Sequence, residues 1–154
     1  MKISKIFLGG FVVGVLDISY AILFWWLRAR VSPVRIFQSV AAGLLGRDAA
    51  RAGGIRTALL GAALHFLIAF TIVLVYASAS RMMPLLIRRP ILCGTVYGVL
   101  VYAVMNYVVI PLSAAGGGGG GTVMLWIVCS ILVHAFLIGV PAALFSRQAL
   151  GGAK

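Results

Sequence analysis

Four polar side chains lie near the middles of four long apolar runs: Asp17, His65, Asn106 and His134. A carboxylate and two imidazoles can bind and release protons, hydrogen-bond a small solute or ligate a metal ion. A charged aspartate at the centre of a membrane helix costs about 2.5 to 3.5 kcal/mol on insertion scales. We therefore expect Asp17 to face the interior of a helix bundle or to lose its charge.

Three further polar side chains lie one helical turn from members of this set: Tyr20, Tyr102 and Ser130. Successive membrane helices run in opposite directions, so an early position in one and a late position in the next have the same depth. His65 is early in the second run and Asn106 is late in the third. The sequence predicts one buried polar layer of all seven residues, at or above the midplane on the side of the first and third connections.

Three functions are compatible with such a layer. The side chains can form a hydrogen-bonded knot that fixes helix register, or a path for protons or a small solute, as acids and histidines do in transporters. Two histidines and a carboxylate can also bind a transition metal, or two histidines a haem. No His-x-x-x-His or Cys-x-x-Cys pair favours the metal or haem alternative. We predict no metal, no cofactor and no catalytic residues, because no nucleophile stands beside a base in a recognisable signature.

The elements that must position this layer are the apolar runs themselves, at residues 6–27, 58–79, 91–112 and 123–145. A membrane-spanning helix needs about 20 mostly apolar residues. Hydrophobic residues make up 63% of the chain and charged residues 10%, whereas roughly 25% of a soluble domain is charged. The sequence predicts an all-α polytopic membrane protein, a four-helix bundle forming a single domain over residues 1–154.

The first run resembles a cleaved signal peptide in its basic start and in the small residues at 19–21. The apolar stretch continues without a break to residue 27, so a retained first span is the better interpretation. Aromatic and basic residues then stand together, as they do at a membrane interface. The residues expected to contact lipid headgroups are Trp25, Trp26, Arg28, Arg30 and Arg35.

The first connection contains a helix of its own. Ser32 and Pro33 form a helix-start signal, and Gly46 is a plausible stop. The apolar side chains between them fall largely on one face. We predict an amphipathic helix that lies in the headgroup region or packs over the end of the bundle. The charged stretch at 47–51 that follows is expected to be solvated and locally ion-paired.

The positions of glycine, alanine and proline indicate how the helices pack, connect and bend. Small residues four apart predict close packing of the helices, at Gly10 and Gly14, Ala58 and Ala62, Gly94 and Gly98, and Gly139 and Ala143. The glycine run at 116–121 predicts a linker in the third connection. Pro141 is expected to kink the fourth span.

The net charge of +11 arises from 13 Lys and Arg against 2 acidic residues. These basic residues lie at the ends of the spans rather than on one binding face, so we expect anionic lipid headgroups as partners and no nucleic acid. Basic residues divide almost equally between the two sides of the membrane. The Arg-rich second connection and the uncharged third favour a cytoplasmic location for both termini.

Several short stretches resemble a family of small uncharacterised bacterial inner-membrane proteins with four spans. They are LDISY at 16–20, SP at 32–33, QSVAAGLLG at 38–46, ALHF at 63–66 and MNY at 105–107. The resemblance implies the bacterial cytoplasmic membrane and no known activity. The function expected is a proton-linked or small-solute transport component. The alternative is a non-enzymatic accessory or scaffold subunit, in a homo-oligomer or a larger membrane complex.

Overall fold

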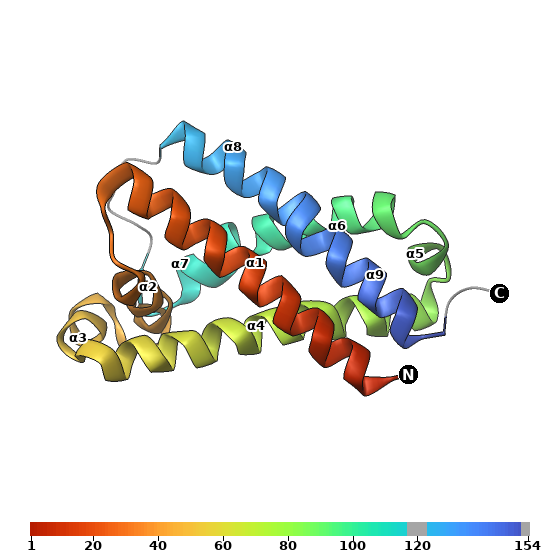
Figure 1. The fold of residues 1–154 in the computed structure, drawn as a ribbon, viewed down its shortest axis with the longest axis horizontal. Helices are drawn as coiled ribbons and strands as arrows, with labels where there is room; N and C mark the ends of the chain where they lie inside the picture. The colour runs from red at the N-terminus through yellow and green to blue at the C-terminus, as the bar shows by residue number, and fades with distance from the viewer. Residues whose placement is uncertain (117–122, 152–154) are drawn as a thin grey trace.

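The computed structural model describes residues 1–116 and 123–151, and every regular element among them is a helix (Figure 1). Four of its helical segments have the length and apolar character needed to cross a bilayer: Ile3–Ala29, Gly54–Met82, Pro90–Leu112 and Met124–Ala149. The prediction of an all-α multi-pass membrane protein is therefore confirmed. Each segment extends beyond its predicted limits at one end or both, because the helical backbone continues past the apolar run.

The elements follow one another as α1 (Ile3–Ala29), α2 (Pro33–Leu45), α3 (Arg47–Ala52), α4 (Gly54–Met82), α5 (Leu85–Arg88), α6 (Pro90–Val104), η1 (Met105–Val109), α7 (Ile110–Leu112), α8 (Met124–Val133), η2 (His134–Gly139) and α9 (Val140–Ala149). The third span is continuous through α6, η1 and α7, and the fourth through α8, η2 and α9. The two η elements are π-helical turns inside these spans.

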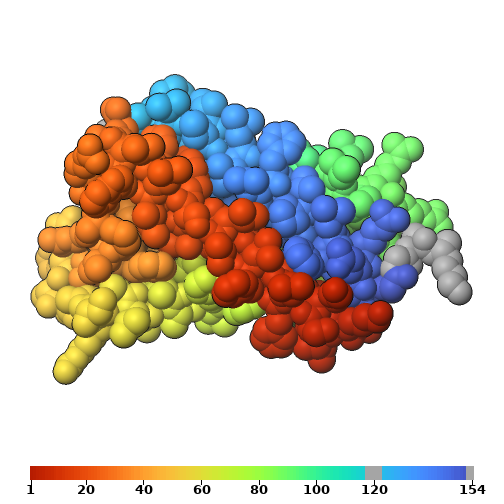
Figure 2. Space-filling view, in the orientation of Figure 1, coloured from red at the N-terminus to blue at the C-terminus, as the bar shows by residue number. Residues whose placement is uncertain are grey.

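The bundle has two distinct ends (Figure 1). The helices α2 and α3 lie at one end with α7, and the start of α1 and the end of α9 lie at the other end near α5. Helix α1 packs on α4 and α9, and the third span packs on η2 and α9. Figure 2 shows α1 and α9 side by side across one face of the molecule. This arrangement places the first and third connections on the same side, as the polar-layer prediction requires.

Glycines let the helix backbones approach closely, as their spacing predicts. A Cβ on Gly98 would overlap the carbonyl oxygen of His134, and one on Gly139 would overlap that of Gly94. A Cβ on Gly10 would overlap the ring of Phe70. These small-residue faces are therefore filled by neighbouring helices of the same chain.

Helix α2 begins and ends where the sequence predicts. The Ser32 hydroxyl accepts a hydrogen bond from the Arg35 backbone N–H at 3.4 Å, Pro33 occupies the first turn, and Gly46 ends the helix with a φ of 82°. The structure shows α2 packed against α4, which agrees with either predicted placement. It lies against α4 at Gly61, where a Cβ would overlap the Phe37 carbonyl oxygen.

The stretch after α2 differs from its prediction. Residues 47–52 form the short helix α3, and no ion pair joins Asp48 to an arginine within the described residues. The Arg47 side chain instead donates from Nε to the Ala115 carbonyl oxygen at 2.8 Å. A backbone acceptor that is 68 positions away thus replaces the expected local carboxylate. Most of the glycine run at 116–121 lies outside the described residues, so the predicted linker is not described.

The irregular winding in the fourth span begins well before Pro141. The π-helical turn η2 starts at His134, and η1 in the third span likewise precedes Pro111. Proline lacks a backbone N–H, so the carbonyl four residues earlier loses its helical partner. Wider turns upstream accommodate such defects and are frequent at functional sites. Both π-helical turns begin at or beside a predicted polar residue.

Candidate polar site inside the bundle

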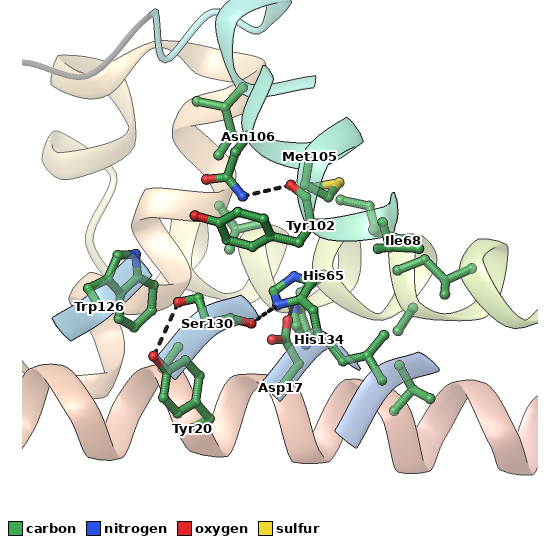
Figure 3. Close-up of a pocket in the computed structure, with 18 residues that line it drawn as sticks. Asp17, Tyr20, His65, Ile68, Tyr102, Met105, Asn106, Trp126, Ser130 and His134 are labelled. Carbon is green, nitrogen blue, oxygen red and sulfur yellow. Dashed lines mark hydrogen bonds and ion pairs between the residues drawn. The ribbon is translucent and has the colours of Figure 1, made fainter. Parts of the chain in front are cut away.

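All seven residues predicted for the polar layer line one cavity of about 240 Å³ (Figure 3). They come from all four spans: Asp17 and Tyr20 from α1, His65 from α4, Tyr102 and Asn106 from the third span, and Ser130 and His134 from the fourth. A water molecule takes about 30 Å³ in the liquid. The cavity therefore has room for several waters or one small polar solute.

His65 is anchored by a backbone acceptor. Its Nε2 lies 2.8 Å from the carbonyl oxygen of Gly14, and the ring is buried. A carbonyl oxygen can only accept, so Nε2 carries the hydrogen and donates it to α1. In the neutral ring the other nitrogen, Nδ1, is then an acceptor.

Asp17 faces that second nitrogen. The Asp17 Oδ2 lies 4.0 Å from His65 Nδ1, and the Asp17 side chain is 31% exposed. Two arrangements of one proton leave this pair without net charge: a carboxylate beside an imidazolium, or a carboxylic acid beside a neutral imidazole. Burying an unpaired charge would be much costlier than either. The distance exceeds a hydrogen bond, so proton exchange between them needs a bridging group, for which the cavity has room.

The Asp17 carboxylate is the charged group of the cavity lining. Within residues 1–116 and 123–151 it receives no hydrogen bond, and its side chain is partly exposed at 31%. Polar groups that serve only structure are normally hydrogen-bonded. The carboxylate is thus left open to the cavity.

Three further hydrogen bonds hold polar residues of the cavity. His134 Nδ1 donates to the Ser130 carbonyl oxygen at 2.8 Å, and the Asn106 amide donates to the Tyr102 carbonyl oxygen at 2.9 Å. Both acceptors lie four residues back, in the α-helices that precede the π-helical turns. The Ser130 hydroxyl in turn lies 3.1 Å from the Tyr20 hydroxyl. These contacts orient the groups and leave His134 Nε2 as the ring nitrogen with no anchor among the described residues.

One aromatic member of the cavity lining was not predicted. Trp126 lies one turn before Ser130 on α8 and stacks on Tyr20 with ring centroids 5.1 Å apart (Figure 3). The spacing rule that identified Ser130 from His134 identifies Trp126 as well when it is applied once more. Trp25 also packs on Trp126, at 5.2 Å.

The predicted headgroup residues divide into two groups. Trp26, Arg28, Arg30 and Arg35 are exposed at the α2 end of the bundle, and the Arg30 guanidinium lies 5.8 Å from the Trp26 ring centroid. Trp25 is half-buried against Trp126. Its side chain therefore belongs to the aromatic cluster beside the cavity more than to the surface.

A metal site has little support from the geometry. In the part of the chain that the structure describes, no three His, Cys, Asp or Glu side chains come together as ligands. Each histidine also commits one ring nitrogen to a backbone carbonyl. The cavity is better suited to protons, water or a small solute than to a transition metal.

Comparison with known proteins adds no relative. No protein-family model, no curated protein and no solved structure matches this chain. The chemistry of the cavity is therefore the basis for a functional proposal.

Proposed function

We propose that this protein is a proton-linked or small-solute transport component of the bacterial cytoplasmic membrane, with Asp17 and His65 as its proton-exchanging pair. The observation that carries the proposal is the Asp17 carboxylate, open to a cavity of about 240 Å³ and 4.0 Å from His65 Nδ1. Protonatable groups inside a membrane bundle mark ion and solute pathways in many transporters.

Asp17 and His65 suit proton exchange because a proton can move from one to the other without leaving an uncompensated charge. When a proton moves between Asp17 and His65, the pair stays neutral overall. When the pair loses that proton, one negative charge remains facing the cavity, where a cation or a new proton can compensate it. The hydroxyls of Tyr20 and Ser130 and the ring of His134 extend the polar lining. They offer hydrogen-bonding partners to a solute or a water chain.

A hydrogen-bonded knot with no transport role is the main competing explanation. A knot stabilises the bundle by satisfying its polar groups, and Asn106 and His134 fit that description. Asp17 does not, because its carboxylate has no hydrogen-bond donor among the described residues. The accessory-subunit alternative loses support as well, since the glycine faces that would bind a partner are filled by neighbouring helices.

The transport proposal is tested by proton flux into vesicles. Protein reconstituted in liposomes with an internal pH dye is compared with Asp17→Asn and with the matched control Asp48→Asn, an exposed residue on α3. We expect Asp17→Asn to lower flux at least about tenfold while the amount and thermal stability of folded protein stay unchanged. The control should behave as the wild type. Equal flux in all three proteins, or an Asp17→Asn protein that fails to fold, would favour the knot.

The orientation is part of the same proposal. We place both termini in the cytoplasm, supported by the short Arg-rich second connection at the α5 end of the bundle and by the absence of charged residues from the sequence of the third connection (Figure 1). The α2 end then faces the periplasm. Labelling of Arg88→Cys and Arg56→Cys with an impermeant thiol reagent, in a protein lacking its native cysteines, tests this assignment. Only the Arg56→Cys protein should react in intact cells.

A further inference from the structure

A second hollow lies at the α2 end, separate from the polar cavity in its chemistry. It has a volume of about 980 Å³ and lies between α2, α3, α4 and the end of the third span. Three arginines line it, Arg35 from α2 and Arg47 and Arg51 from α3. We call this hollow the arginine groove.

The arginines of the groove are not neutralised by the protein. The chain has only 2 acidic residues: Asp17 faces the polar cavity, and Asp48 is not part of the groove lining. Among the described residues, none of the three guanidinium groups forms an ion pair. The Arg47 Nε donates a hydrogen bond to the Ala115 carbonyl oxygen. The two terminal guanidinium nitrogens of Arg47 have no acceptor among the described residues. The groove therefore presents positive charge with no protein carboxylate beside it among the described residues.

The rest of the lining is mostly apolar and extends deep into the bundle. Leu64 and Ile68 from α4 face Met105 and Val109 from η1 across the groove. Ile68 follows the first residue of α4 by fourteen positions, which is about 21 Å of helix at about 1.5 Å per residue. The groove thus runs from a charged mouth at the end of the bundle to an apolar floor near the depth of the polar layer.

We propose that the arginine groove binds one anionic phospholipid from the surrounding leaflet. Its phosphate would lie at Arg35, Arg47 and Arg51, and an acyl chain would lie against Leu64, Ile68 and Val109. Arginine pairs with phosphate through two parallel hydrogen bonds, which gives the mouth its chemical selectivity. A free phosphate would leave the apolar depth unfilled. A second copy of this chain, with its net charge of +11, would be repelled by the mouth.

The groove and the polar cavity share a wall. Val40, Ile68, Met105 and Ile110 line both hollows. An acyl chain in the groove would press on this wall from the outside and help to keep the cavity closed on that side. The lipid site itself depends on the groove alone, so it stands whether or not Asp17 exchanges protons.

The test measures lipid retained by the purified full-length protein. Native mass spectrometry is run on protein from nanodiscs containing phosphatidylglycerol or phosphatidylcholine in equal amounts. We expect one tightly retained phosphatidylglycerol and no retained phosphatidylcholine. The double variant Arg35→Gln, Arg51→Gln should weaken retention about thirtyfold, while the control pair Arg56→Gln, Arg81→Gln, exposed but outside the groove lining, should change it less than about threefold.

A second pair of variants tests the apolar floor. Val109→Trp fills the groove and should weaken phosphatidylglycerol retention, whereas Val108→Trp, an exposed neighbour outside the lining, should not. Millimolar inorganic phosphate should fail to displace the lipid. Equal retention of phosphatidylcholine, equal losses in the two arginine pairs, or full displacement by inorganic phosphate would each overturn the proposal.

Discussion

The two halves of the bundle are built differently, although the same four spans pass through both. Toward the termini, the helices pack into a solid core in which Val73 and Tyr76 are almost fully buried and line neither hollow. Toward α2, the helices separate around two hollows. The solid half holds the spans together, and this allows the other half to remain open.

The polar groups of the two halves show the same contrast. In the solid half, Tyr97 donates to the Ile72 carbonyl at 2.8 Å, Tyr76 donates to the Leu86 carbonyl at 3.0 Å, and Ser146 donates to the Val73 carbonyl at 3.4 Å. Each of these hydroxyls is satisfied by backbone and has a structural role. In the hollow half, the Asp17 carboxylate lines the polar cavity 4.0 Å from His65 Nδ1 and receives no hydrogen bond among the described residues. A polar side chain inside a membrane bundle is therefore a stronger functional candidate when it has no hydrogen-bond partner in the protein.

Substitutions at the closest contacts between helices should lower the unfolding free energy of the bundle most. Gly98→Ala places a Cβ against the His134 carbonyl, so the third and fourth spans must separate. We expect a loss of about 3 kcal/mol or more in unfolding free energy, measured by thermal unfolding in detergent. The matched control is Gly43→Ala on α2, where the added Cβ meets only ordinary contacts at 3.8 Å. Similar losses in both proteins would contradict the close approach at Gly98.

Truncation of isoleucine should distinguish the solid half from the hollow half. Ile6→Ala removes a buried side chain from the solid half, away from both hollows, and we expect it to destabilise the protein by about 2 to 4 kcal/mol. Ile68→Ala acts on the wall between two existing hollows and should cost less than half as much. Chemical or thermal unfolding of the two variants provides the measurement. Equal effects would mean that the hollows are filled by protein in solution.

Substitution of Asp17 should have the smallest effect on stability. Asp17→Asn keeps the side-chain shape and breaks no hydrogen bond among the described residues. We expect a change within about 1 kcal/mol. His65→Ala should cost more, about 1 to 3 kcal/mol, because it removes the hydrogen bond to Gly14 and leaves a buried gap. The reverse order would mean that Asp17 is part of the structural framework.

Much of the polar site follows from the sequence, because helical periodicity and alternating span direction determine which side chains share a depth. The clustering of Asp17, His65, Asn106 and His134 required nothing more. The arginine groove could not be predicted in the same way. Its walls depend on α2 packing at Gly61 and on the Arg47 contact with Ala115, both between segments distant in the sequence.

The fine geometry of the site was also beyond the sequence. The turn η2 begins at His134, well before Pro141, whereas a missing proline N–H frees only the carbonyl four residues earlier, so the proline position does not predict where η2 begins. The orientation of the His65 ring depends on its contact with the Gly14 carbonyl on another helix. Such contacts arise from tertiary packing, so periodicity places the residue but not its hydrogen bonds.

The central claim is that Asp17 exchanges protons inside the bundle. The chain has only 2 acidic side chains, so Asp48→Asn leaves Asp17 as the sole side-chain carboxyl. Infrared difference spectra of this variant between acidic and alkaline buffer, with Asp17→Asn, Asp48→Asn as the blank, then report Asp17 directly. We expect a carboxylic-acid C=O band that appears on acidification and is absent from the blank. Identical spectra for the two proteins would contradict the account and leave Asp17 as a group that does not titrate.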